Sequence, residues 1–248
     1  MSVDPRRARE FSAALRRWFG RHGRDLPWRR TRDPYRVLVS EAMLQQTQVS
    51  RVVGFYDRFL ERFPTLDDLA RAPHRRVRES WEGLGYYARA RNLHALARSV
   101  TTIPAEPEAL RRLPGIGAYT AGAVASFAFE RRAALVDTNV ARVLRRVFAP
   151  RADFRTSRGQ KRLWAIAEQV LPRTGKATWT HNQAIMELGA LVCTARVAHC
   201  DRCPVSSLCR SRKATTHPNQ AKRNPNASEE QKESSSRRAR GALNAGGT

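Results

Sequence analysis

Lysine is nearly absent from this chain. It occurs at five of 248 positions and nowhere in the first 160, so the basic charge there comes from arginine. A lysine amine is therefore excluded as a nucleophile in the first two thirds of the protein. An apolar run of about twenty residues and a signal-peptide core are also missing, so we expect a soluble, intracellular (cytoplasmic) protein that does not enter a membrane.

Acidic residues are few beside basic ones. The chain has 46 Lys and Arg against 22 Asp and Glu, a net charge of +24. Residues 211–248 hold eight basic and three acidic residues, a net +5, which leaves +19 on the first 210. A body this basic indicates a polyanionic partner, and nucleic acid fits best. The Ser-, Arg-, Asn- and Glu-rich segment 211–248 is predicted to be a disordered basic tail.

Alternating strand patterns are missing as well, and helical periodicity takes their place. The expected helices span 5–22, 35–44, 49–63, 66–71, 74–81, 86–100, 106–112, 118–129, 138–148, 157–171 and 180–191. Thr47 is expected to cap the third, and Asp137 or Thr138 the ninth. The sequence thus predicts an all-α protein.

Cysteine is limited to four residues, Cys193, Cys200, Cys203 and Cys209, with the spacing C-x6-C-x2-C-x5-C. One loop can wrap such closely spaced thiolates around a single centre, either a structural Zn²⁺ or an iron–sulfur cluster. The spacing matches neither common ferredoxin pattern and lacks the paired C-x2-C units of a zinc ribbon. Disulfides or four buried thiols are the alternative, although disulfide frameworks belong mainly to short secreted domains.

The segment Leu113–Ala121 reads L-P-G-I-G-A-Y-T-A and is typical of a helix-hairpin-helix. Gly115 and Gly117 let the backbone approach a phosphate closely, and the N–H groups that begin the next helix favour an anion. Such contacts position DNA without reading its sequence. An ordinary turn between antiparallel helices is the alternative.

The hairpin, an aspartate about twenty residues later and the cysteine spacing together resemble the endonuclease III superfamily of base-excision DNA glycosylases. Within it, residues 40–49 (S-E-A-M-L-Q-Q-T-Q-V), 83–90 (G-L-G-Y-Y-A-R-A) and 26–29 (L-P-W-R) resemble the A/G-specific adenine glycosylases. The match runs from about residue 24 to 209. It implies two helical lobes with DNA in the cleft between them: a helical barrel bearing the hairpin, 24–135, and a cluster lobe, 1–23 with 136–210. It also implies a [4Fe-4S] cluster on the four cysteines.

Two carboxylates stand at positions that match the catalytic pair of this family. Breaking an N-glycosidic bond builds positive charge on the sugar and needs a protonated leaving base, a task that glycosidases divide between two carboxyl groups. Glu41, beside the apolar Ala42–Leu44, is expected to be the acid. Asp137 is expected to stay ionised and face the oxocarbenium ion. The alternative for Glu41 is an exposed helix carboxylate, and the alternative for Asp137 is a helix N-cap. Asp137 can also be both the N-cap and a catalytic residue.

Tyr119 occupies the position where bifunctional relatives carry the lysine that forms a Schiff base with the sugar. The resemblance therefore implies a monofunctional enzyme, with Tyr119 hydrogen-bonded to Asp137 or the sugar. Hairpin packing is the alternative for Tyr119.

The resemblance assigns further residues to DNA and to the base. Base flipping needs a wedge in the vacated stack, and Gln46 and Tyr86 match the wedge positions, while Thr47 and Leu84 match contacts to the opposite base. Asn139 is expected to orient around Asp137. The adenine pocket matches Arg24, Trp28, Leu44, Val49 and Glu187, and Trp28 is equally compatible with core packing.

Two features depart from the family pattern. Thr138 stands where many adenine glycosylases have glycine. Such enzymes also usually carry a C-terminal domain that recognises 8-oxoguanine, whereas the residues after 210 read as a basic tail. We therefore expect discrimination of the opposite base to come from the two lobes alone.

The sequence thus predicts a monomeric, monofunctional glycosylase that removes adenine opposite 8-oxoguanine or guanine in double-stranded DNA, in association with the nucleoid. A mismatch glycosylase for thymine or uracil is one alternative. A non-catalytic DNA-binding iron–sulfur protein is the other.

Overall fold

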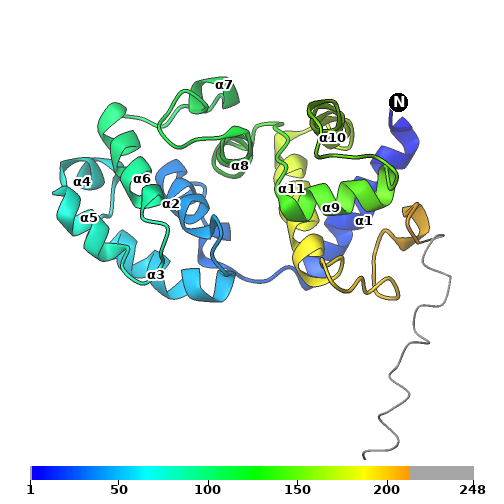
Figure 1. Ribbon diagram of the computed structural model, residues 1–248, viewed down its shortest axis with the longest axis horizontal. Helices are drawn as coiled ribbons and strands as arrows, with labels where there is room; N and C mark the ends of the chain where they lie inside the picture. The colour runs from blue at the N-terminus through cyan, green and yellow to red at the C-terminus, as the bar shows by residue number, and fades with distance from the viewer. Residues whose placement is uncertain (1, 213–248) are drawn as a thin grey trace, which may run out of the picture. The chain divides into compact units, whose positions relative to one another are not determined.

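The computed structural model describes residues 2–212, which lie almost wholly within one compact unit, Met1–Ser211 (Figure 1). An isolated bridge between Cys193 and Ala198 is the one element of β-structure in this part of the chain. The all-α prediction is confirmed. From residue 213 onward the predicted tail lies outside the described residues.

One group of helices gathers around α2, Pro34–Leu44, which contacts α3, α6, α8 and the short 3₁₀ helix η1, Pro27–Arg29. Residues 37–43 of α2 are all buried because neighbours cover it on every side. The other helices of this group are α3 (Val49–Arg62), α4 (Leu66–Arg71), α5 (His74–Ser80), α6 (Ala88–Ser99), α7 (Pro107–Leu110) and α8 (Ala118–Phe129).

The second group joins the two ends of the described chain (Figure 1). Helix α11, Gly175–Leu191, packs against α1, Pro5–His22, and against α9, Thr138–Phe148, which in turn contacts α10, Ser157–Gln169. The predicted apolar face of α1 is buried here, and the Phe11 ring meets that of Phe148 edge-on at 5.0 Å. Contacts between α11 and α8 connect this group to the first.

Most of the described α-helices begin within two residues of the predicted start, and six of the eleven have an N-cap side chain that accepts from the first backbone N–H groups. Asp137 caps α9 as expected. Thr47 does not cap α3: the N-cap residue is Gln48, which makes no side-chain capping bond. Helix α11 begins five residues before the predicted start, since Thr174 caps it by accepting from the Ala177 N–H.

No helix among the described residues is long and apolar enough to cross a membrane.

A close approach between α8 and the segment before α9 fixes where the Asp137 cap lies relative to α8. A Cβ atom on Gly122 would stand 2.0 Å from the Ala134 carbonyl oxygen, so this contact requires glycine.

We therefore expect Gly122→Ala to destabilise the protein by about 2–3 kcal/mol, as overpacked cores do. Gly54→Ala is the matched control, because Gly54 lies within α3 and a Cβ added there would meet no atom within 4 Å, so alanine should stabilise by ~0.5–1 kcal/mol. Urea unfolding measures both. Equal stabilities for the two variants would contradict the close approach.

Candidate active site and cysteine loop

A cavity of about 180 Å³ lies where α2, α8, α9, α11 and η1 meet. It brings together side chains that the sequence separates by up to about 165 positions, and so it joins the two helix groups. Its lining includes these predicted site residues: Arg24, Trp28, Glu41, Leu44, Thr47, Val49, Tyr119, Asp137, Asn139 and Glu187. Trp28 lines the cavity and is also buried, packing edge-on against Tyr56 as expected of a core residue.

Glu41 is the buried carboxyl of this cavity. It lies in the last turn of α2, it is 3% exposed, and its Oε2 atom has no hydrogen-bond partner. Burial raises the pKa of Glu41 to about 7, and the charge of Asp137 adds to this shift. The Tyr119 hydroxyl and the Arg29 cation act in the opposite direction. The surface-carboxylate alternative for Glu41 is therefore wrong.

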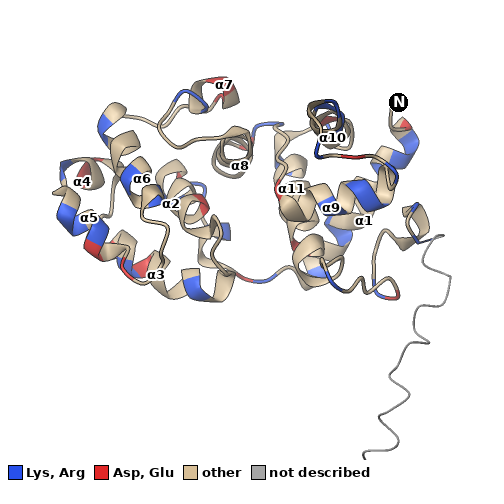
Figure 2. Cartoon of the chain, in the orientation of Figure 1, with Lys and Arg blue, Asp and Glu red and all other residues tan. Residues whose placement is uncertain are grey.

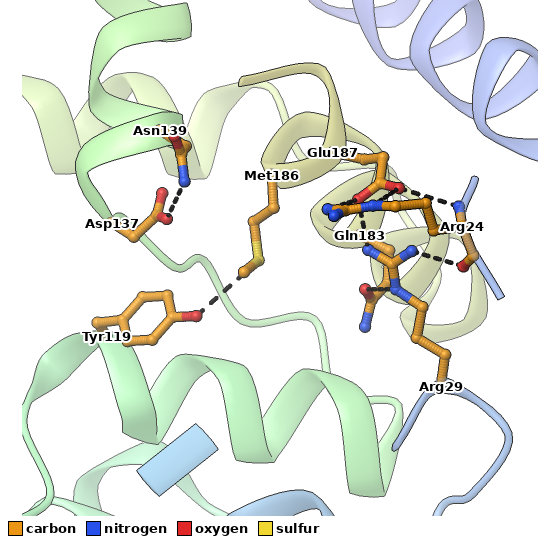
Figure 3. Close-up of polar contacts among 8 residues, drawn as sticks. All are labelled: Arg24, Arg29, Tyr119, Asp137, Asn139, Gln183, Met186 and Glu187. Atoms are coloured by element: carbon orange, nitrogen blue, oxygen red, sulfur yellow. Dashed lines mark hydrogen bonds and ion pairs between the residues drawn. The ribbon is translucent and has the colours of Figure 1, made fainter. Parts of the chain in front are cut away.

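Tyr119 lies in the first turn of α8, half-buried. Its hydroxyl points toward Met186 of α11, with an oxygen–sulfur distance of 4.0 Å (Figure 3). Burial raises its pKa well above the usual value, and the carboxyls of Glu41 and Asp137 raise it further. Tyr119 is thus a neutral hydroxyl facing two carboxyl groups.

Asp137 is the N-cap of α9 and lines the cavity at the same time. Its Oδ1 accepts from the Val140 N–H at 2.7 Å, and its Oδ2 accepts from the Asn139 amide at 3.0 Å (Figure 3). These two donors, one from the backbone and one from a side chain, hold the carboxyl in one orientation. The N-cap interpretation of Asp137 is confirmed, and the Asn139 side chain lies against it as predicted.

Glu187 on α11 is ionised and clamped by two arginines (Figure 3). Arg24 donates from Nε at 2.8 Å and from Nη2 at 2.9 Å, and Arg29 donates from Nη2 at 2.9 Å. Burial alone would raise the pKa of Glu187, but these bonds outweigh it and lower the pKa to about 2. Arg29 also donates to Gln183 at 2.8 Å, so one planar guanidinium fixes this side of the cavity.

The two predicted wedge residues lie outside the cavity, each in a strained turn. Gln46 has φ +56° and Tyr86 has φ +47°, a left-handed conformation that costs a non-glycine residue about 1–3 kcal/mol. Tyr86 is 60% exposed, as a wedge requires, and Tyr87 is exposed too rather than packed in the core. Leu84, expected at the opposite base, is instead 5% exposed in the core.

The predicted helix-hairpin-helix is formed by α7, α8 and the exposed turn between them. Gly115 takes φ +74°, and a Cβ there would lie 2.6 Å from that of Asn92, so this position requires glycine. Gly117 is the N-cap of α8 and has open space beside it, which leaves its backbone accessible. Figure 2 shows basic residues on helices of both groups, including α5, α6 and α1.

The four cysteines form no disulfide and lie half-buried in the loop that follows α11. Burial raises the pKa of Cys203 to about 11, and each of the other three thiols raises it further, so the four lie near one another. Arg146 donates to the Cys193 sulfur at 3.2 Å, which places a cation beside them. In number and type these donors fit a thiolate-bound metal centre, whose positive charge would offset the cost of deprotonation. Within residues 2–212, no group of three or more His, Cys, Asp or Glu side chains is arranged to hold a single metal ion.

Some lining residues have no sequence signal. Arg29 belongs to the L-P-W-R motif, but the motif assigns no role to it. Four other lining residues belong to no motif: Phe127, Gln183, Met186 and Ala190. Gln183 lies four residues before Glu187 on α11 and Ala190 lies three residues after it, so the i, i+3, i+4 rule applied to Glu187 would have found these two but not Met186.

Residues 39–169 match the family model described as "HhH-GPD superfamily base excision DNA repair protein". The chain belongs to the HhH-GPD superfamily. It is 45% identical to the human adenine DNA glycosylase over 82% of this chain and 39% of that protein. It is 43% identical to the adenine DNA glycosylase of Mycolicibacterium smegmatis over 86% of this chain and 71% of the relative.

Among solved structures, a thermostable thymine-DNA glycosylase is similar to this HhH-GPD protein, with a TM-score of 0.77 and 31% identity. That alignment covers 84% of this chain and 98% of the other. The chain spans about two fifths of the length of the human, rat and mouse adenine DNA glycosylases.

The buried carboxyl makes a pH-dependent prediction. Because the folded pKa of Glu41 is about 7 against an ordinary 4.5, the folded state holds this proton more tightly than the unfolded chain does. The associated stability is fully present below pH ~4.5 and is lost as the pH rises to ~7, by about 3 kcal/mol. Glu41→Gln should therefore raise the Tm above pH 7 and have little effect at pH 4.5.

Thermal unfolding of both proteins from pH 4.5 to 8 measures this difference. Glu10→Gln on the exposed side of α1 is the control and should not change the pH dependence. An equal response of wild type and Glu41→Gln to pH would contradict a raised pKa at Glu41.

Proposed function

We propose that this HhH-GPD protein is a monofunctional DNA glycosylase that hydrolyses the N-glycosidic bond of adenine opposite 8-oxoguanine or guanine in double-stranded DNA. One observation carries the proposal: a buried carboxyl with a raised pKa, Glu41, shares a cavity with Asp137, each of whose carboxyl oxygens accepts a hydrogen bond. The adenine DNA glycosylases among its relatives support the choice of base.

Glu41 supplies the proton. A carboxyl with a pKa near 7 is protonated in a useful fraction of molecules at neutral pH and can donate to a ring nitrogen of a flipped adenine. Protonation makes the base a neutral leaving group as the bond to the sugar breaks. Water then adds to the sugar carbon, and its proton goes to the Glu41 carboxylate, which restores the acid.

Asp137 stabilises the positive charge that develops on the sugar. Its two hydrogen bonds hold the carboxylate in one orientation, so no reorganisation is needed as the charge forms. Tyr119, neutral and between the two carboxyls, positions the sugar or Asp137. Arg24, Arg29 and Glu187 form the polar wall that recognises the base edge.

No lysine lines the cavity within the described residues, and the first 160 positions contain none. A Schiff base with the sugar therefore has no amine, and the product is an abasic site in an intact strand.

DNA binding is assigned to the hairpin turn and to the Gln46 and Tyr86 turns. The exposed backbone at Gly115 and Gly117 receives a phosphate, and the arginine-rich surface adds salt-sensitive attraction. We divide the described chain accordingly into residues 24–135, with the hairpin, and residues 1–23 with 136–210, with the cysteine loop.

We assign a [4Fe-4S] cluster to Cys193, Cys200, Cys203 and Cys209. When bound, this group supplies structural cross-linking of the loop after α11. No step of base release passes through it.

Base release on duplexes carrying A opposite 8-oxoguanine, A opposite G, or T opposite G tests the function. We expect strand breaks at adenine only after hot alkali, because a monofunctional enzyme leaves an abasic site, and a rate that falls tenfold per unit as the pH rises above ~7. Glu41→Gln should lower the rate about 10²- to 10⁴-fold, as loss of a general acid does, while Glu10→Gln should not.

Breaks at T opposite G would move the assignment to thymine, the substrate named for the similar solved structure. Breaks without alkali, or efficient borohydride trapping on DNA, would contradict the monofunctional mechanism. Full activity of Glu41→Gln would remove Glu41 as the acid.

Metal analysis tests the cluster separately. We expect brown protein with about four irons and four sulfides per chain, since four thiolates bind one such cluster. Cys203→Ser should lower the iron content and the Tm together, whereas His199→Ser in the same loop should lower neither. Tight zinc without iron would contradict the assignment.

A further inference from the structure

Arg89, in the first turn of α6, is a buried arginine whose hydrogen bonds all go to backbone carbonyls. It is 8% exposed. Its Nη1 donates to Ala42 (3.1 Å), Met43 (2.6 Å) and Gln45, its Nη2 to Leu84 (3.3 Å) and Gly85 (3.0 Å), and its Nε to Tyr86 (3.4 Å). One guanidinium thus connects the end of α2 to the turn before α6.

The acceptors explain how this cation is tolerated without an acidic partner. Ala42 and Met43 are in the last turn of α2, where carbonyls lack intrahelical donors and the helix dipole is negative. The rings of Trp81 and Tyr86 lie 5.5 Å from the guanidinium carbon and add cation–π attraction. Arg89 therefore acts as a helix C-cap that reaches across to a second segment.

Both connected segments contain strained backbone. Gln46, Tyr86 and Glu130 are the non-glycine residues with positive φ in the described chain. Two of these three adjoin carbonyls that Arg89 binds, since Gln45 precedes Gln46 and Tyr86 is itself an acceptor. Such conformations persist only where the surroundings fix them, and Arg89 bonds the backbone beside both.

We propose that Arg89 is a positioning residue that holds the Gln46 and Tyr86 turns at a fixed separation and in register with Glu41. The proposal rests on the proposed function, because it assigns the two turns to the DNA stack beside the cavity. Arg89 itself touches neither base nor sugar. It acts through Ala42 and Met43, which follow Glu41 directly, and through the backbone on either side of the two turns.

The role requires arginine. A guanidinium has five N–H donors in a rigid plane and can serve two segments at once, whereas a lysine ammonium has three donors at one point. Arg89→Lys keeps the positive charge but can bond only one of the two segments. The substitution therefore separates bridging from charge.

We would compare Arg89→Lys with wild type and with Arg98→Lys, an exposed arginine at the end of the same helix. The readouts are single-turnover adenine release, duplex affinity, fluorescence of 2-aminopurine at the target position, and hydrogen exchange of amides 45–47 and 84–87 in the free protein. Arg89→Lys should slow release about 10- to 100-fold, as small misplacements at active sites do, and should change Kd less than about threefold. It should weaken the fluorescence change and speed exchange in both segments. Arg98→Lys should match wild type.

Three results would overturn the proposal: unchanged release and exchange in Arg89→Lys, a loss of affinity as large as the loss of rate without faster exchange, or faster exchange throughout the protein. If wild type releases no adenine, the proposed function fails. The exchange measurement on free protein still decides whether Arg89 couples the two turns.

A second variant keeps the test informative if Arg89→Lys folds but is too unstable for the activity assay. Glycine adopts positive φ without strain, so Gln46→Gly should lessen the loss of Tm caused by Arg89→Lys. A double variant as unstable as the additive sum would contradict the link between Arg89 and the strained turn.

Discussion

The desolvation of Glu41 is the constraint on which the rest of the site depends. Burying an ionised carboxyl without partners destabilises the folded protein. One oxygen of Glu41 has no hydrogen-bond partner that would offset this cost. The position can persist because α2 is enclosed by α3, α6, α8 and η1, whose packing supplies the compensating apolar burial. The groups that tune Glu41 come from three further segments, Arg29 from η1, Tyr119 from α8 and Asp137 from α9. The raised pKa of Glu41 is therefore a property of the assembled helices and not of the S-E-A-M-L segment.

Glu41 and Glu187 show how the environment can shift the pKa of the same type of side chain in opposite directions. Glu41 and Glu187 are both nearly inaccessible and line one cavity, yet the pKa of the first is about 7 and that of the second about 2. The difference comes from the two arginines that bind Glu187. Arg29 links the carboxyls, because it bonds Glu187 and also lowers the pKa of Glu41. Because Arg29 is held on Glu187, its approach to Glu41 is limited, and the clamp helps to keep the pKa of Glu41 high.

Helix bounds could be predicted from the sequence where caps and apolar periodicity determine them. They were predicted less well where contacts between helices determine which residues are helical or line the cavity. Asp137 and the apolar period after it define α9 within the chain itself. Helix α11 was predicted five residues short because Gly175–Trp179 carry little apolar periodicity, although Thr174 is a recognisable cap. The carboxyls were predicted through motifs, whereas Gln183 and Met186 enter the cavity only because α11 packs beside α8 and α1. Leu84 was assigned to DNA by resemblance, and its burial reflects packing that no short motif encodes.

The use of arginine in place of lysine has a structural consequence as well as a chemical one. Arg142 donates to the Asn139 side chain at 2.6 Å, to the Gly189 carbonyl at 2.7 Å and to the Cys193 carbonyl at 2.7 Å. The side chain that orients Asp137 therefore shares one guanidinium with the first residue of the cysteine loop. Arg89 and Arg29 likewise join segments distant in sequence through several donors in one plane. A lysine at any of these positions would keep the charge but lose the second attachment. The arginines that give the chain its charge thus also fix the relative positions of the cavity, the two strained turns and the cysteine loop.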